Sequence, residues 1–266
     1  MKSIQLIKSN LMTIITKSNL IIFLSVFSLQ FYLFSTVYGI SQSYSLQKAL
    51  IIIYYGPFNQ PLEIFRWLFH QVPILVLIGY FIDKEIKSRS IYILHRIGNI
   101  NTWLNGITLS SLVCTILYYF FGLSLSLLLI TFFRSYYESN TLFQNFQLLN
   151  QYNPVILLLH LFFLLVLSTY SMILIYTILS ILLKSVTISF TILIILILIS
   201  SMVTNIFPVV IQWLPSAQGM LINREYSKIE FSLSYIYLIT LNLFLSVFLY
   251  QILKKQLSEI LSENDY

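Results

Sequence analysis

Charged residues are scarce in this chain of 266 residues: only 9% are Asp, Glu, Lys or Arg, whereas 58% are hydrophobic. Soluble domains have roughly a quarter of their residues charged, so this composition excludes a soluble globular protein. Long uncharged runs separate the few charges, and about 20 apolar residues in a helix span a bilayer core. A transmembrane β-barrel is excluded too, because its strands alternate apolar and polar residues over about ten positions. The predicted fold class is an all-α, polytopic membrane protein.

Several kinds of chemical site are also missing from the sequence. The single cysteine, Cys114, excludes a disulfide framework and a cysteine metal site. There is no G-x-x-x-x-G-K-[ST], G-x-G-x-x-G or H-E-x-x-H segment, so the familiar nucleotide and zinc motifs are absent. An intramembrane hydrolase is disfavoured, because no nucleophile–base pair or cluster of metal ligands is visible. We therefore expect no enzyme activity, no cofactor and no metal in this chain.

The basic residues indicate the topology. The net charge of +6 would by itself suggest a nucleic-acid partner, but the lysines and arginines follow the predicted loops, so we expect none. With six spans and both termini in the cytoplasm, ten basic residues lie inside and five outside, as the positive-inside rule requires. The predicted spans are approximately residues 19–40, 62–82, 103–133, 154–183, 186–207 and 231–253. A cytoplasmic loop (83–102), an outer loop (208–230) and a cytoplasmic tail (254–266) complete this scheme.

Residues 1–18 have an amphipathic pattern. Ile4, Ile7, Leu11 and Ile14 recur at helical spacing, while lysines and hydroxyl residues occupy the other side. This pattern predicts an interfacial helix in the lipid headgroup layer. A cleaved signal peptide is disfavoured, because the apolar run that follows is too long for an h-region.

Polar residues within the predicted spans are few. No acidic residue lies in the core of a span, which argues against ion-coupled transport. Arg66 lies near the outer end of the second span, and we expect its long side chain to extend toward the outer surface. His70 and His160 raise the possibility of a proton relay. The favoured interpretation is that His70 lies near a span end and that His160 caps the start of span four.

The segment 83–106, DKEIKSRSIYILHRIGNINTWLNG, is the most informative part of the sequence. Charges gather at its start, and Ile91, Ile93 and Leu94 then form an apolar patch on a charged helix. Gly98 and the asparagine after it break that helix before the next span. A loop that only reverses the chain needs no such patch, so we expect it to contact a partner protein or, as the alternative, the membrane surface.

These features together resemble the ABC-2-type permeases. The architecture carries the resemblance: six spans, an N-terminal amphipathic helix, a charged helix and turn after span two, and a long outer loop before span six. Within the cytoplasmic loop it is carried by Glu85, Arg89, Leu94, Gly98 and Gly106. Arg96 and Trp103 are similar to a narrower group, the small bacterial permeases associated with peptide export or bacteriocin immunity.

The resemblance implies a permease subunit without a nucleotide site of its own. ATP and Mg would bind to a partner ABC ATP-binding subunit, and a second permease copy, identical or different, would complete the transporter. The implied location is the bacterial cytoplasmic membrane, in contact with its lipids. The loop after span two would be the coupling helix, and its implied ATPase-coupling residues are Glu85, Arg89, Ile91, Leu94, Arg96 and Gly98.

The sequence says less about the cargo. Candidate residues for a substrate path carry hydroxyl or amide groups: Gln30, Tyr32, Ser201, Thr204 and Asn205. Because the spans lack charge, such a path suits an amphipathic or apolar cargo, for example an antimicrobial or signalling peptide. The alternative function is a non-transporting immunity or sensor protein that sequesters a peptide toxin at the membrane.

Overall fold

The structure, a computed structural model, describes residues 2–38, 45–57, 61–85, 100–133, 146–203, 210 and 212–263. Within these ranges the regular secondary structure is helical and no residue is in a strand. Five of the described helices are long and apolar enough to cross a membrane: α2 (Lys17–Tyr38), α4 (Pro61–Lys84), α6 (Ile100–Phe133), α8 (Pro154–Leu182) and α13 (Phe231–Glu263). The chain is therefore an all-α, multi-pass membrane protein, as its composition predicts.

Helix α9 (Val186–Val203) is apolar but shorter. Its 18 residues give a length of about 27 Å, slightly less than the ~30 Å hydrocarbon core. A tight turn at Lys184 joins α8 to α9, between the predicted spans 154–183 and 186–207, and this lysine has a left-handed backbone with φ of 51°. The total of six spans depends on α9 and stays a prediction.

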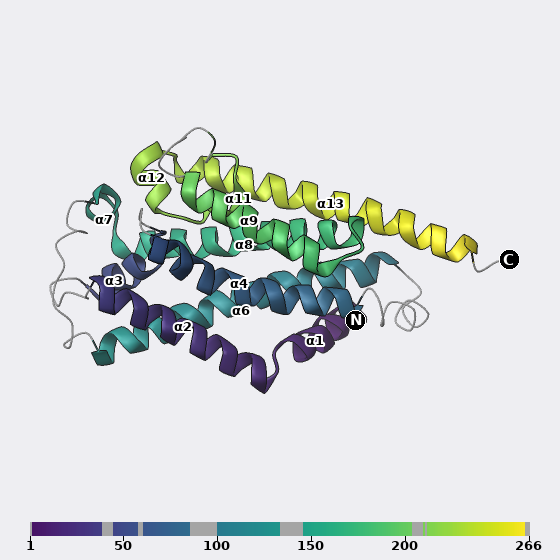
Figure 1. The fold of residues 1–266 in the computed structure, drawn as a ribbon, viewed down its shortest axis with the longest axis horizontal. Helices are drawn as coiled ribbons and strands as arrows, with labels where there is room; N and C mark the ends of the chain where they lie inside the picture. Colours follow the sequence, from purple (N-terminus) through teal and green to yellow (C-terminus); the bar gives the residue numbers. More distant parts are fainter. Residues whose placement is uncertain are drawn as a thin grey trace.

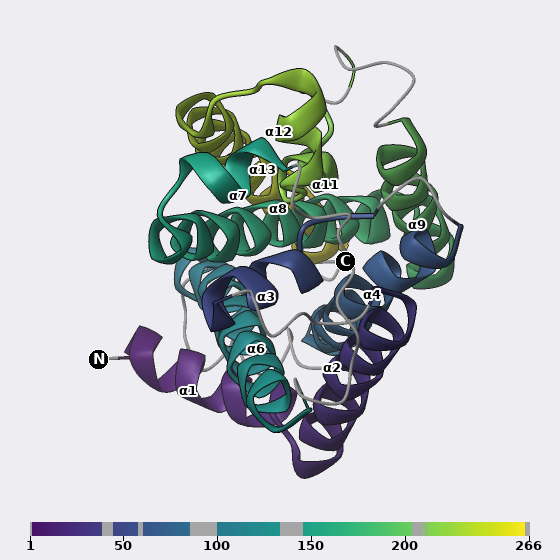
Figure 2. The same ribbon diagram turned by 90° about the vertical axis from the view of Figure 1, so that its left-hand side faces the viewer.

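The long helices run along one common axis, as Figure 1 shows. Seen from the end, α1 (Lys2–Ile14), α2, α4 and α6 lie on one side of α8, and α13 lies on the other (Figure 2). Helix α8 is the central element, because it packs against α4, α6, α9 and α13. Its middle is accordingly almost continuously buried, from Leu164 to Leu174 with one partly buried residue.

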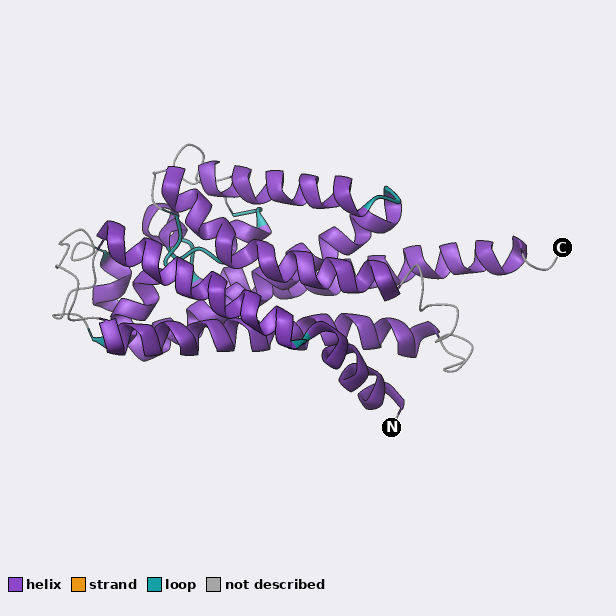
Figure 3. Ribbon diagram, turned by 60° about the horizontal axis from the view of Figure 1, so that its bottom comes forward, coloured by secondary structure: helices purple, strands orange, loops and turns teal. Residues whose placement is uncertain are grey.

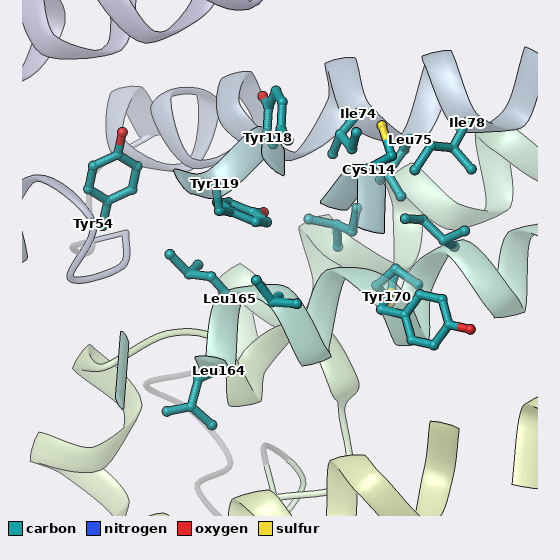
Figure 4. Close-up of a cluster of buried hydrophobic side chains, with 14 of the residues drawn as sticks. Tyr54, Ile74, Leu75, Ile78, Cys114, Tyr118, Tyr119, Leu164, Leu165 and Tyr170 are labelled. Carbon is teal, nitrogen blue, oxygen red and sulfur yellow. The ribbon is translucent and has the colours of Figure 1, made fainter. Parts of the chain in front are cut away.

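The interior of the bundle is filled by aliphatic and aromatic side chains. Ile74, Leu75 and Ile78 of α4 belong to one cluster with Cys114 of α6 and with leucines of α8 (Figure 4). The outward face is also apolar: large side chains such as those of α13 are more than half exposed. A surface of this kind is stable against lipid tails, so the exposed face is consistent with a membrane environment.

The two ends of the bundle differ in what covers them. At one end lie four short helices: α3 (Leu46–Ile53), α7 (Gln147–Gln151), α11 (Pro215–Gln218) and α12 (Ile222–Ser227). We call this the cap end. At the other, the α1 end, α1 leaves the bundle axis at an angle (Figure 3). There α13 continues as a helix to Glu263, through ten residues of the segment that the sequence assigns to a tail.

Candidate functional site

The cap end contains a buried ion pair on the first turns of α4. Glu63 and Arg66 are each 1% exposed, with Arg66 Nη2 2.6 Å and Nε 3.0 Å from the carboxylate oxygens. The guanidinium also donates to the carbonyl oxygens of Ile53 and Gly56, next to the C-terminus of α3. The expectation that Arg66 extends to the outer surface is wrong. Its charge is neutralised inside the protein, and its remaining donors satisfy carbonyls that the helix end leaves open.

His70, one turn further along α4, is fully buried among aromatic rings. Its ring centroid lies 4.3 Å from that of Trp67, 5.9 Å from Tyr54 and 6.2 Å from Tyr119. Neither of its ring nitrogens has a hydrogen-bond partner among the described residues. A neutral imidazole carries one donor and one acceptor, so both remain unsatisfied inside the bundle.

The tyrosines around His70 are satisfied, in contrast to the histidine. The Tyr118 hydroxyl donates to the His70 carbonyl at 2.7 Å, and the Tyr119 hydroxyl lies 2.6 Å from the Thr169 hydroxyl. Tyr118 and Tyr119 lie at one side of the apolar cluster, with Tyr54 beyond them (Figure 4). These hydrogen bonds connect α6 to α4 and α8 and fix the positions of the aromatic side chains around the histidine.

Two glutamines are, like His70, buried without a hydrogen-bond partner for their side chains. Gln30 of α2 is 0% exposed and Gln71 of α4 is 1% exposed, and neither side-chain amide has a partner among the described residues. A buried polar group without a partner costs about 1–3 kcal/mol. Polar groups in the interior of a membrane bundle are therefore rarely retained without a role, and they mark candidate paths. We call Gln30, His70 and Gln71 the interior polar residues.

The structure places the predicted path residues in different surroundings. Gln30 is buried in the bundle, whereas Tyr32 is 57% exposed on the outer face of the same helix. Ser201 is buried on α9, and its hydroxyl donates to the Ile197 carbonyl of its own helix. Thr204 and Asn205 lie outside the described residues. Gln30 and Tyr32 thus cannot line one path within a single chain, and a path formed by two copies stays a prediction.

The predicted coupling residues are mostly outside the described part of the chain. This holds for Arg89, Ile91, Leu94, Arg96 and Gly98. Glu85 is described, directly after the end of α4, and is 1% exposed. The flanking helices place the two ends of this segment at the α1 end of the bundle (Figure 1). Its contact with an ATPase stays a prediction.

At the α1 end, α1 packs along α6. The amide of Asn10 is completely buried and donates to the carbonyl of Gly106 at 3.4 Å and to the hydroxyl of Ser110 at 3.3 Å. Gly106 allows the close approach, because a Cβ atom there would lie 2.3 Å from a methyl carbon of Leu6. Asn10 is not among the residues predicted from the sequence. The available signal was its helical spacing from the apolar Leu6 and Ile14, which places it on the packed face.

A second buried arginine organises the cap end beside α13. Arg224 of α12 is 4% exposed, and it donates to the carbonyls of Gln218 and Met220 and, at 2.7 Å, to the Ser234 hydroxyl. Its guanidinium also lies 4.9 Å from the Phe231 ring centre. Burial lowers the pKa of Arg224 to about 10, so it remains charged at neutral pH.

The neighbouring Glu225 makes its contacts elsewhere. Its carboxylate accepts a hydrogen bond of 2.5 Å from the Tyr55 hydroxyl and bonds from the main-chain nitrogens of Gln147 and Leu148. A carboxylate at this place caps the first turn of α7. Glu225 thereby connects the residues after α3 with α7 and α12, and all four short helices of the cap end are held by buried or half-buried charged groups.

His160 does not cap α8, contrary to the interpretation from sequence. The cap is Asn153, whose side-chain oxygen accepts from the nitrogen of Val155 at 2.9 Å. His160 instead stacks on Phe231 with a centroid distance of 4.3 Å, and its Nδ1 lies 2.9 Å from the Tyr235 hydroxyl. The histidine therefore joins α8 to α13.

Comparison with protein-family models, with curated proteins and with solved structures finds no match to this chain. The function must accordingly be argued from the fold and from the residues described above.

Proposed function

We propose that the protein is the membrane-spanning permease subunit of an ATP-binding-cassette transporter. In this proposal it crosses the bacterial cytoplasmic membrane six times with both termini inside, it pairs with a second permease copy, and a separate ATPase binds ATP and Mg. The cargo is an amphipathic or apolar molecule, such as an antimicrobial or signalling peptide, that is exported.

The observation that carries the proposal concerns the α1 end. Helix α4 ends at Lys84 and α6 begins at Ile100, and α1 packs against both of these helices. The segment whose sequence resembles a coupling helix therefore joins two core helices at the end where α1 lies. The distribution of lysines and arginines assigns the same end to the cytoplasm. An ATPase that moved this segment would act directly on α4 and α6.

The interior polar residues are the groups in this chain that we propose contact a cargo. Gln30, His70 and Gln71 offer neutral donors and acceptors inside the bundle without partners of their own. Such groups can bind amide or hydroxyl groups of a cargo in place of water. Among the described residues, the side chains of Glu63 and Arg66 form an ion pair. Each charge neutralises the other, so the pair is not available for coupling to an ion gradient.

Coupling can be tested with the Leu94→Asp variant. The protein is expressed together with its neighbouring genes and reconstituted, and ATP hydrolysis is measured with and without added cargo peptide. We expect Leu94→Asp to abolish the cargo-stimulated part, since a charge in an apolar anchor removes the packing that dominates such contacts. Leu94→Ile, the matched control, should retain it.

Membrane insertion of both variants is checked by their yield and elution in detergent. Cargo-stimulated hydrolysis that is unchanged in a correctly inserted Leu94→Asp variant would contradict the coupling assignment. A protein that binds a peptide toxin but has no ATPase to stimulate would instead favour the immunity or sensor function.

A further inference from the structure

A groove at the cap end has no part in the proposed path. It has a volume of about 690 Å³, within the range of small-molecule sites, and lies between the residues around α11 and α12 and the first turns of α13. The part of the groove next to α11 and α12 is polar and includes Gln218, Ser227 and Lys228. The part along α13 is apolar and includes Ile236 and Phe244. The groove is thus amphipathic along its length.

Hydrogen bonds between the surrounding helices fix the shape of the groove. Its wall residue Ser234 accepts from the Arg224 guanidinium at 2.7 Å and donates to the Gln218 side chain at 2.6 Å. At the rim, the Tyr237 hydroxyl donates to the Trp213 carbonyl at 2.6 Å. These bonds hold α11, α12 and α13 together before any ligand arrives, and a preformed site of this kind loses little entropy on binding.

The charge in the lining of the groove is positive, and the exposed Glu230, two residues after Lys228, is outside the lining. Lys228 is the one charged residue in its lining and is exposed, and it forms no ion pair with any residue that the structure describes. The guanidinium of Arg224 lies directly behind Ser234, so a second positive charge supports the same site. Glu225 does not line the groove and is bound to Tyr55.

The dimensions of the groove fit one leaflet of a bilayer. Leu233 and Phe244 of its lining are 11 residues apart on α13, which is about 16 Å, or half of the ~30 Å hydrocarbon core. Leu233, Ile236 and Phe244 are 59%, 63% and 65% exposed, so the groove opens toward the lipid. Trp213, which is 68% exposed, lies beside Tyr237 in the lining, and tryptophan commonly marks the membrane interface.

We propose that this groove binds one anionic phospholipid of the phosphatidylglycerol type. Its headgroup phosphate lies beside Lys228, and one acyl chain follows Ile236, Thr240 and Phe244 toward the middle of the membrane. The charge favours an anionic headgroup, and the position and depth favour a lipid chain. The proposal requires the membrane location but not the transporter function.

Trp213 allows the site to be observed directly. Of the three tryptophans in the chain, Trp67 and Trp103 are 0% and 1% exposed, so brominated lipids quench chiefly the fluorescence of Trp213. The purified protein is reconstituted into phosphatidylcholine vesicles that contain a small fraction of brominated phosphatidylglycerol or, in parallel, brominated phosphatidylcholine. We expect about fivefold stronger apparent binding of the brominated phosphatidylglycerol, the effect of one lysine at a membrane surface.

Two variants with matched controls separate the headgroup from the chain. Lys228→Gly should reduce the preference to about onefold, because it removes the charge. Its left-handed backbone, with φ of 53°, suits glycine, so the fold is retained. Lys184→Gly is the matched control, because Lys184 also has a left-handed backbone, with φ of 51°, but lies at the α1 end. This variant should leave the lipid preference unchanged. Thr240→Phe fills the groove and should also abolish the preference, whereas Leu243→Phe, outside the lining, should not.

The outcomes are distinct. A preference that is lost in Lys228→Gly and Thr240→Phe but kept in both controls supports the proposal. Equal quenching of the wild type by both lipids overturns it, and the groove would then accept any lipid chain or be covered by another molecule. A preference that survives in Lys228→Gly or in Thr240→Phe overturns it as well, because the anionic lipid would be held elsewhere.

Discussion

The cap end and the α1 end of the bundle are held together by different interactions. At the cap end, two buried arginines and a half-buried glutamate bind main-chain carbonyls, hydroxyls and helix ends. At the α1 end, the described contact between α1 and α6 depends on the Asn10 amide and on the small residue Gly106. Charged hydrogen bonds are shorter and roughly twice as strong as neutral ones.

This difference indicates which end moves more easily. Breaking the cap end would separate buried charged groups from their hydrogen-bond partners, so we expect this end to keep one set of contacts. Tilting α1 against α6 breaks only neutral bonds that cost about 1 kcal/mol each. An end with such contacts is suited to transmit a movement, and in the proposed function it is the end that meets the ATPase.

The largest effect is expected for Glu63→Gln at the cap end. The substitution keeps the shape but leaves the Arg66 charge buried without its counterion, which should lower the free energy of unfolding by about 3–5 kcal/mol. Thermal unfolding in detergent measures the loss. The double variant Glu63→Leu with Arg66→Met should recover part of it, because it removes both charges. A single variant as stable as the wild type would show that the pair does not hold the cap.

An intermediate effect is expected for Arg224→Leu. The Ser234 hydroxyl and the carbonyls of Gln218 and Met220 lose a donor, and each unsatisfied buried group has a cost, so we expect a loss of about 2 kcal/mol. The exposed Lys228, replaced by leucine, serves as control and should change stability by less than about 0.5 kcal/mol. Equal losses in the two variants would remove the distinction between a buried and an exposed cation here.

A smaller effect on stability is expected for Asn10→Leu at the α1 end. The Ser110 hydroxyl still donates to the Gly106 carbonyl, so the free energy of unfolding should fall by only about 1 kcal/mol. Cargo-stimulated ATP hydrolysis should nevertheless decrease, because the position of α1 on α6 is changed. Ser9→Leu, on the exposed side of α1, is the control. A large loss of stability without a change in hydrolysis would reverse the roles assigned to the two ends.

The smallest effect is expected where glycine replaces a lysine that has a left-handed backbone conformation. Lys184→Gly and Lys228→Gly should each stabilise the protein by about 0.5–1 kcal/mol, since glycine adopts a positive φ without strain. Both lysines are exposed, so the gain should be similar at the two ends when thermal unfolding is compared. A loss of stability in one variant alone would identify a contact of that lysine within the fold.

The sequence predicts the long helices well, because they are governed by local properties. A membrane helix requires an uninterrupted apolar run, and the start of α8 at Pro154 and the turn at Lys184 follow from proline and charge at those positions. Helix α11 likewise begins at a proline, Pro215, within the predicted outer loop 208–230. These features depend on residues that are neighbours in the sequence.

The sequence does not predict contacts that depend on distant segments. The outward direction predicted for Arg66 is wrong, because the carbonyls that it binds, those of Ile53 and Gly56, are 13 and 10 residues away in the sequence. His160 bonds to Tyr235, 75 residues away, and no local pattern indicates that pair. The interior polar residues were found only in part: Gln30 from its polarity within a span, but Gln71 only from its burial.

The central claim, that the protein is moved by a separate ATPase, is tested most directly by affinity purification. The tagged protein is expressed together with its neighbouring genes, purified in mild detergent and analysed by mass spectrometry. We predict that a P-loop ATPase co-purifies with the wild type and is reduced at least tenfold with Leu94→Asp, while Leu94→Ile retains it. A correctly folded wild type that brings no ATPase with it, in the presence of its genomic neighbours, would contradict the account.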